Sequence, residues 1–272
     1  MKLKRNTFLF IRSLIVNFDY ILGSLLGINK DYLSILCFHS ISDGGNRYSI
    51  GLTDFKRELK TISQNANFVN IDEAIEVIGG QRVEKPSVVL TFDDGYKDAL
   101  KVVPLIKEYQ IPAVIFILSD RKNANRKELD NKTKLLSTEE IKQLVKEGWT
   151  IGCHSATHAD FTSLSPSQIK KEIIDSKKSI EKEIGIKIKY FAYPKGVLSD
   201  EIIKAVKKAG YIAAFGVWPG NVERGSNKWN IPRIVIDASH SLVDFPAIYS
   251  PSVLFLRRIT DPLKIWDLFL SL

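Results

Sequence analysis

Apolar residues follow two different rhythms along this chain of 272 residues. Short runs rich in β-branched and aromatic residues recur between residues 33 and 236, and most are apolar at every position. Strands buried on both faces have this composition, because neither face meets water. The predicted strands are LSILCF, FVNI, SVVLTF, PAVIFIL, WTIGC, YFAY, YIAAFGV and IPRIVI.

Between these runs, apolar residues recur every three or four positions, as they do on one face of a helix. The predicted helices are TDFKRELKTIS, YKDALKVVPLIKEY, STEEIKQLVKEG, SPSQIKKEIIDSKKSIEKEIG and SDEIIKAVKKAG. The last three begin at a serine suited to the N-cap and close at a glycine. These residues are Ser137, Ser165 and Ser199, with Gly148, Gly185 and Gly210. Alternating strands and helices predict an α/β fold with a parallel sheet, open or closed into a barrel.

The first 30 residues have a pattern of their own. A basic cluster precedes one apolar stripe at helical spacing, formed by Phe8, Ile11, Ile15, Phe18, Leu22 and Leu25. Arg12, Asn17 and Asp19 interrupt the run, so no continuous stretch reaches bilayer length. Residues 1–28 are interpreted either as a helix packed on the domain or as an interfacial helix on anionic lipid. No small-residue cleavage site stands out, so a cytoplasmic or peripheral membrane location is expected rather than a secreted one.

Composition narrows the possible partners. An apolar content of 44% supports one large core or two small ones, and the net charge of +8 permits an anionic partner. The basic residues are spread along the chain without a nucleic-acid-binding motif, so no nucleic acid partner is expected. The two cysteines, Cys37 and Cys153, each end an apolar run and are interpreted as small buried residues rather than a disulfide framework.

Two adjacent carboxylates, Asp93 and Asp94, follow the run SVVLTF and precede Gly95. Their mutual repulsion at a buried strand end requires compensation, which a cation would supply. His154 and His158 stand four residues apart in GCHSATHAD and can share one ion. Imidazole nitrogens with one carboxylate oxygen suit Zn²⁺ or a similar divalent ion. One aspartate would then bind the ion while its neighbour acts as general base.

The residues with candidate chemistry all follow predicted strands. They are His39, Asp93, Asp94, His154, Pro194 and Trp218. The carboxyl ends of parallel strands meet at one edge of the sheet, where barrels and doubly wound sheets build their active sites. We therefore expect these side chains to share one site.

TFDDG, HSATH and FAYPKG, in that order, resemble the first three motifs of the polysaccharide deacetylases, the carbohydrate esterases of family 4 with a NodB-homology domain. The resemblance covers roughly residues 33–236. It implies a distorted (β/α) barrel and metal-dependent removal of acetyl groups from an N-acetylated glycan: a poly- or oligosaccharide or a glycan precursor. Three parts are then expected: an amphipathic segment (1–30), the catalytic domain (31–240) and a C-terminal extension (241–272).

The resemblance also implies roles for particular residues. Asp93 resembles the catalytic base. Asp94, His154 and His158 resemble the ligands of one divalent ion, zinc in the first place, with cobalt or nickel as alternatives. In the implied mechanism the ion polarises water and the acyl carbonyl, and Asp93 takes the proton of the water.

The third motif departs from the family pattern at two positions. Ala192 stands where the family has an arginine that orients the base, and Arg233 is a candidate replacement. A surface arginine on an edge strand is the alternative interpretation of Arg233. Lys195 replaces a tyrosine whose backbone N–H holds the oxyanion, a role that any residue except proline can keep. With Tyr193 and Pro194, Lys195 is expected to form the oxyanion and substrate side of the site.

The general acid has two candidates, His39 and His240. The branch of the family that acts on exopolysaccharide N-acetylglucosamine has a histidine after its first strand, in a context similar to LCFHSIS. This resemblance favours His39, and His240, beyond the last predicted strand, is the alternative. Four aromatic residues are candidates for stacking on sugar, with burial in the core as the alternative: Phe191, Tyr193, Trp218 and Trp229.

Two other functions compete with deacetylation. A phosphotransferase of the haloacid-dehalogenase type needs its two carboxylates separated by one residue and needs no histidine pair, so Asp93 and Asp94 argue against it. A non-catalytic carbohydrate-binding domain derived from a deacetylase is the second alternative, suggested by Ala192. Retention of the residues that resemble the base and all three metal ligands favours an enzyme.

Overall fold

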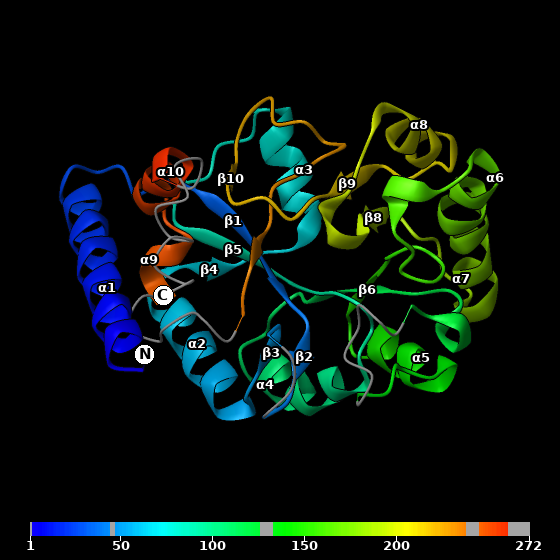
Figure 1. Cartoon of the computed structure of the whole chain (residues 1–272), viewed down its shortest axis with the longest axis horizontal. Coiled ribbons are helices and arrows are strands. Elements are labelled where there is room, and N and C mark those ends of the chain that lie inside the picture. The colour runs from blue at the N-terminus through cyan, green and yellow to red at the C-terminus, as the bar shows by residue number, and fades with distance from the viewer. Residues whose placement is uncertain (1, 44–46, 126–132, 238–244, 261–272) are drawn as a thin grey trace.

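The computed structural model describes residues 2–43, 47–125, 133–237 and 245–260 (Figure 1). Nine strands form its main sheet: β1 (Leu33–Phe38), β4 (Asn67–Phe68), β5 (Ser87–Phe92), β6 (Val114–Ile117), β7 (Thr150–Cys153), β8 (Tyr190–Ala192), β9 (Ala213–Phe215), β10 (Asn221–Val222) and β11 (Ile234–Val235). A separate parallel pair consists of β2 (Ser40–Ile41) and β3 (Ser49–Ile50).

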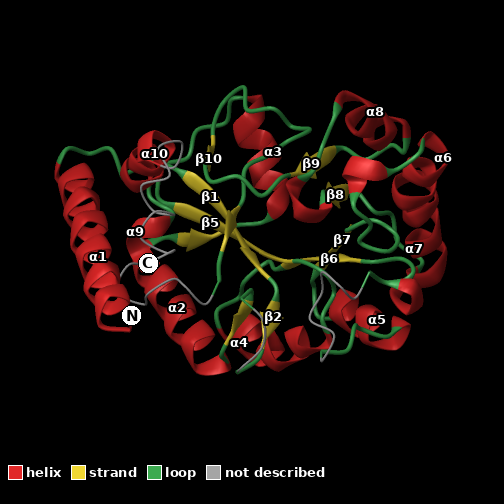
Figure 2. Ribbon diagram, viewed as in Figure 1, coloured by secondary structure: helices red, strands yellow, loops and turns green. Residues whose placement is uncertain are grey.

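Helices surround the strands (Figure 2). The α-helices are α1 (Lys2–Leu25), α2 (Leu52–Asn65), α3 (Ile71–Gly79), α4 (Val103–Glu108), α5 (Thr138–Lys146), α6 (Pro166–Ile169), α7 (Ser176–Ile184), α8 (Asp200–Lys208), α9 (Phe245–Ile248) and α10 (Pro251–Thr260). A π-helical segment, Lys170–Asp175, joins α6 to α7. Short 3₁₀ turns are Lys97–Val102, Arg121–Asn123, Phe161–Ser163 and Pro194–Gly196. Among the described residues, none of the helices combines the length and the apolar content needed to cross a lipid bilayer.

The sheet is a distorted, parallel-stranded barrel, as the sequence predicts. Its order is β10-β1-β5-β6-β7-β8-β9, and within this order only the β10–β1 pair is antiparallel. A parallel bridge joins Phe215 at the end of β9 to Ile231, and β11, a few residues further on, pairs with β1. The segment 231–235 therefore connects the last strand back to the first and curls the sheet.

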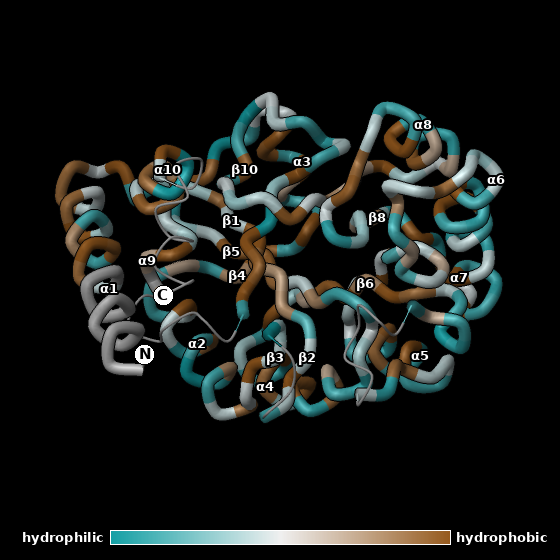
Figure 3. The backbone as a smooth tube through the Cα atoms, viewed as in Figure 1, coloured by the Kyte–Doolittle hydropathy of each residue, from teal (hydrophilic) through white to brown (hydrophobic). Residues whose placement is uncertain are grey.

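Two apolar clusters pack on opposite sides of the strands, and apolar residues occupy the centre of the molecule (Figure 3). Alternate residues of β5 divide between them: Val88, Leu90 and Phe92 face the helices, whereas Val89 packs with Phe116 on the concave side. This period of two follows from the pleat of a strand. It determines which polar residues point into the barrel where the strands end.

Seven of the eight runs predicted as strands contain one, and Ser137, Ser165 and Ser199 accept N-cap hydrogen bonds as predicted. Two of the predicted runs differ from the expectation. The run FVNI keeps only the last residue of β4, because Asn70 and Glu73 form a capping box that starts α3, a helix the apolar pattern did not predict. YKDALKVVPLIKEY is a 3₁₀ turn followed by α4, because Pro104 lacks an N–H to continue a longer α-helix.

Candidate active site at the carboxyl ends of the strands

A buried ion pair between Asp93 and Arg233 occupies the barrel just beyond β5. Arg233 Nη1 and Nη2 donate to the two carboxylate oxygens of Asp93 at 2.7 Å each, and Arg233 Nε donates to the Gly216 carbonyl at 2.9 Å. Both side chains are at most 1% exposed. Arg233 is therefore not a surface residue, and it supplies the fork of donors missing at Ala192.

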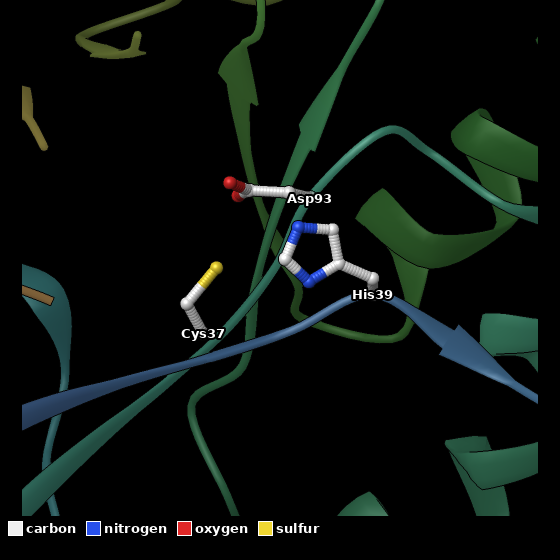
Figure 4. A group of neighbouring side chains, drawn as sticks. All are labelled: Cys37, His39 and Asp93. Carbon is white, nitrogen blue, oxygen red and sulfur yellow. The ribbon is translucent and has the colours of Figure 1, made fainter. Parts of the chain in front are cut away.

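Strand register explains why His39 and Asp93 meet. β1 and β5 are parallel with Cys37 opposite Thr91, and side chains alternate between faces with a period of two. Two residues further on, His39 and Asp93 form the next pair on the same, concave side. Figure 4 shows Cys37, His39 and Asp93 gathered where the two strands end. The sulfur, one ring nitrogen and one carboxylate oxygen of these residues lie within 4.8 Å of one another.

Asp94, His154 and His158 form a second group, which fits a metal ion. Asp94 Oδ1 lies 3.4 Å from His154 Nε2 and 3.5 Å from His158 Nε2. All three side chains are buried, and Asp94 Oδ1 has no hydrogen-bond partner. A buried oxygen without a donor, facing two imidazole nitrogens, is costly unless a cation joins them. Two nitrogens and one oxygen match a zinc site that keeps coordination positions open.

The backbone orients one of these imidazoles for metal binding. His154 Nδ1 lies 2.9 Å from the Ala192 carbonyl oxygen, so it carries the proton and donates it. In the neutral form of the ring, which is the form that binds metals, Nε2 carries the lone pair and lies 3.4 Å from Asp94 Oδ1. Ala192, which lacks the family's arginine side chain, thus contributes through its main chain.

Burial and charge set the pKa values of this cluster. Burial alone raises the pKa of Asp93, but the charge and hydrogen bonds of Arg233, with His154, bring it well below its usual range. The pKa of Asp94 is lowered in the same way, by the histidines acting against burial. Burial lowers the pKa of His158 to about 4, which leaves it neutral and able to bind a metal. For His154 the two carboxylates outweigh burial and raise the pKa.

Backbone strain is concentrated at this site. Five non-glycine residues have positive φ angles in the described chain, and only Gln110 lies elsewhere. The other four are Asp94 (68°), Ser155 (74°), His158 (60°) and Lys195 (56°). Such conformations cost about 1–3 kcal/mol each and persist only where surrounding contacts enforce them. Gly95, with φ 67°, allows the chain to turn after Asp94, where a Cβ would lie 3.1 Å from Ile117 Cγ2.

The group formed by Cys37, His39 and Asp93 is not suited to a metal. Both oxygens of Asp93 already accept from Arg233. Burial raises the pKa of the Cys37 thiol well above its ordinary value, which disfavours the thiolate form that binds metals. His39 is half-buried, and its ring stacks on Tyr48 with centroids 5.0 Å apart. His39 is thus placed beside the base rather than within the metal group.

The remaining predicted residues divide between the site and the core. Lys195 is exposed in the turn after β8, next to buried Pro194. Phe191 and Tyr193 are fully buried, and the Tyr193 hydroxyl donates to the Trp229 carbonyl, so neither ring has a free face for sugar. Trp218 is 46% exposed and keeps a solvent-facing surface. His240 lies outside the described residues.

Glu172 is a buried residue at the site that the sequence did not single out. Its Oε2 accepts from the backbone N–H groups of Ala156 and Thr157 at 2.9 and 2.8 Å, and its Oε1 accepts from the Thr157 hydroxyl at 2.8 Å. These are the two residues between Ser155 and His158. One sequence signal could have identified Glu172: it is a charged residue beside Ile173, on the apolar side of a predicted helix.

Comparisons with known proteins agree with this architecture. Residues 80–214 match the family model described as Polysaccharide deacetylase. A poly-beta-1,6-N-acetyl-D-glucosamine N-deacetylase of Staphylococcus aureus (strain MSSA476) is 30% identical over 230 residues, covering 77% of this chain and 76% of that protein. IcaB from Ammonifex degensii has a TM-score of 0.70 at 23% identity, over 80% of this chain and 97% of that one. The Streptococcus pyogenes deacetylase PplD, solved with acetate, has a TM-score of 0.70 at 21% identity, over 82% of this chain and 100% of that one.

Fold and site together define an α/β-barrel hydrolase with an Asp-His-His group beside a buried carboxylate. The chain belongs to the polysaccharide deacetylase family. The two structural likenesses establish the fold, and the sequence relative establishes the family.

Proposed function

We propose that this protein is a zinc-dependent N-deacetylase that acts on N-acetylglucosamine residues of a polysaccharide, and that β-1,6-linked poly-N-acetylglucosamine is its substrate. The observation that carries the proposal is Asp94 Oδ1, which is buried without a hydrogen-bond donor and faces two imidazole nitrogens. Beside it, Arg233 holds the Asp93 carboxylate through two hydrogen bonds. The named activity of the Staphylococcus aureus relative supports the choice of linkage.

The residues have separable tasks in this proposal. Asp94, His154 and His158 hold the ion, which when bound supplies Lewis acidity at the acyl group and the attacking water. Arg233 keeps Asp93 ionised and aligned, so that Asp93 accepts the proton of that water. Polarised water is acidic enough for a weakly basic carboxylate to suffice. The Lys195 N–H donates to the oxyanion.

His39 completes the reaction by protonating the amine as it leaves. An amide nitrogen departs poorly as an anion, so a proton donor is needed on the leaving-group side. His39 follows β1 directly, and its ring lies beside Asp93 at the end of the same pair of strands (Figure 4).

Mass spectrometry of β-1,6-linked N-acetylglucosamine oligomers, incubated with the protein and Zn²⁺, tests the activity. The oligomers should lose acetyl groups, and Asp93→Asn should abolish most turnover, by about 10²–10⁴-fold, while binding the ion with unchanged stoichiometry. Oligomer binding without deacetylation by the wild-type protein would favour the non-catalytic carbohydrate-binding alternative. Equal rates on β-1,4-linked oligomers would contradict the proposed linkage and leave the deacetylase activity standing.

A comparison of amide and activated ester substrates tests the general acid. His39→Ala should lose most deacetylation of the oligomer yet keep appreciable hydrolysis of nitrophenyl acetate, because nitrophenolate leaves unprotonated. His240→Ala is the matched control and should resemble wild type on both substrates. The opposite pattern would assign the acid to His240.

A further inference from the structure

The outer face of α1 is apolar and exposed. Among the described residues, large apolar side chains that are exposed occur mostly on α1, the turn after it and α10: Leu14, Ile15, Phe18, Ile21, Leu22, Leu25, Leu26, Ile28, Phe255 and Ile259. Elsewhere the same set contains Tyr48, Leu52, Ile212 and Trp218. Exposed apolar residues scattered singly are ordinary, but a contiguous set on one helix marks a contact surface.

The six exposed residues of α1 lie on one side of the helix. Leu14, Phe18 and Leu25 are spaced by four and seven positions, which places them on a single stripe, and Phe18 and Leu25 are 68% and 80% exposed. The opposite side contacts the protein: Val16 is buried with Val253 of α10, and Asn29 beyond the helix donates to Ser252. Helix α1 is thus anchored by one face and presents the other at the edge of the molecule (Figure 1).

Most of the charged residues near this face are basic, and the exposed acid among them is Asp31, next to Lys30. Lys30 at one end and Arg258 on α10 are exposed, and the helix sequence begins with Lys2, Lys4 and Arg5. The only acid within α1 is Asp19, which is half-buried with one carboxylate oxygen enclosed. An apolar stripe bordered by cations complements an anionic lipid surface, whose headgroups are negative and whose interior is apolar.

From the apolar stripe and its basic borders we propose that α1 docks the enzyme on anionic membrane lipid through Phe18, Leu25 and their neighbours. A second copy of the chain is the less favourable occupant. The sequence of α1 begins with Lys2, Lys4 and Arg5, so parallel pairing of two copies through this face would bring basic N-terminal segments together.

Vesicle sedimentation tests the docking. The full chain should bind vesicles of phosphatidylcholine with phosphatidylglycerol, bind phosphatidylcholine alone weakly, and lose binding at high salt. Phe18→Glu/Leu25→Glu should weaken binding by at least about tenfold, since two large apolar side chains no longer enter the lipid. The variant should still hydrolyse nitrophenyl acetate at the wild-type rate.

The matched control is Leu52→Glu/Ile212→Glu, which makes the same charge change at two exposed apolar residues outside α1. It should bind vesicles nearly as well as wild type. Equal losses in both variants would reduce the effect to net charge and overturn the docking face. Wild-type protein that ignores anionic vesicles but sediments as a dimer, which Phe18→Glu/Leu25→Glu dissociates, would show that a second copy occupies the face.

A separate observation concerns the loop that carries the two histidine ligands. Its carbonyls at Ser155, Ala156 and Thr157 accept from the backbone N–H groups of residues 119, 120 and 125, at 3.2, 2.9 and 2.7 Å. On the other side Glu172 accepts the N–H groups of Ala156 and Thr157. Hydrogen bonds thus hold the loop from both sides, with Ser155 and His158 at positive φ.

The geometry points to Glu172 as a positioning residue for the metal group, an inference that rests on the proposed function. Glu172 is 5% exposed and lies in the π-helical segment Lys170–Asp175. A π-helical turn shifts the side chains of its helix out of α-helical register and occurs often at functional sites. Without the carboxylate, the N–H groups of Ala156 and Thr157 lose their acceptor, and fewer contacts hold His158 in its strained conformation.

Zinc affinity, measured by competition with a chromophoric chelator, tests this role apart from activity. Glu172→Gln should weaken binding by about 10–100-fold, as loss of an outer contact to a metal ligand does. The matched control is Glu58→Gln, another buried glutamate, on α2, which should leave the affinity unchanged. If Glu172→Gln does not fold, Thr157→Val removes one of the three contacts and should weaken binding in the same direction.

The outcomes separate the two proposals. Wild-type protein that binds no zinc would refute the metal-dependent function. Wild-type binding with an unchanged affinity in folded Glu172→Gln, even at reduced thermal stability, would make Glu172 merely structural and leave the function standing.

Discussion

The guanidinium of Arg233 shows how one residue can replace another from a different strand. The last residue of β8 is Ala192, which has no side chain that could contact Asp93. Arg233, just before β11, makes this contact instead. What the chemistry requires is a fork of donors against the carboxylate, and the barrel brings β11 to the same place. The cost is a fully buried charge pair whose members depend on each other.

Arg233→Met therefore should be strongly destabilising. Removal of one partner leaves the Asp93 carboxylate buried with its principal donors gone, and the expected loss is about 3–5 kcal/mol in the free energy of unfolding. Urea unfolding measures it. Asp93→Asn/Arg233→Met should recover part of that loss because it removes the unpaired charge. A loss below about 1 kcal/mol in the single variant would contradict the ion pair.

At the scale of elements, helix α2 carries a charged residue type on its buried, otherwise apolar face. Glu58 lies on the buried face with Phe55, Leu59 and Ile62, is 2% exposed, and leaves Oε2 without a partner. Burial, with the charge of Asp54, raises its pKa to about 9 from an ordinary value of 4.5. The folded protein therefore keeps this carboxyl protonated at neutral pH.

This proton makes stability depend on pH. Between pH 4.5 and 9 the folded chain holds the proton and the unfolded chain has lost it, so folding takes up a proton. The stabilising effect is complete below pH 4.5 and is lost as pH rises, with a slope on the order of 1 kcal/mol per pH unit from this group. Glu58→Gln removes the slope, so the variant should match wild type near pH 5 and exceed it near pH 8 in urea unfolding. Parallel curves for the two proteins would contradict the buried, protonated carboxyl.

At the scale of the whole molecule, the active site depends on closure of the sheet. Asp93 and Asp94 follow β5, His154 follows β7, and Arg233 precedes β11, so the site joins strands that are distant in sequence. In the proposed function, an ion held by Asp94 and both histidines would join β5 to the loop after β7, an arrangement that only the folded chain assembles. Ligands of this kind stabilise by mass action.

Zinc should therefore raise the melting temperature in a concentration-dependent way. At one hundred times the dissociation constant the stabilisation is about 2.7 kcal/mol, equivalent to a shift of roughly 5–11 °C for a chain of this size. Differential scanning fluorimetry with and without a chelator measures the shift. His154→Ala/His158→Ala should show none, and an equal shift in that variant would place the ion elsewhere.

Much of the architecture was predictable because it depends on local patterns. Buried parallel strands are continuously apolar, capped helices carry serine and glycine at their ends, and TFDDG with HSATH brings the acids and imidazoles of one metal group. Local patterns also have limits: Asn70 and Glu73 convert the end of a predicted strand into α3, and Pro104 divides a predicted helix. The role of Lys195 and the part boundaries near residues 30 and 240 stay predictions.

The sequence by itself determined the class of fold and predicted the residues proposed as the metal group and the base, because each prediction rests on residue types at short, fixed spacing. Only the tertiary structure decided which distant residues complete the site. Register between β1 and β5 puts His39 beside Asp93, curling of the sheet brings Arg233 to the same carboxylate, and a π-helical turn directs Glu172 at the histidine loop. Such contacts depend on distances between elements far apart in the chain, which local periodicity does not encode.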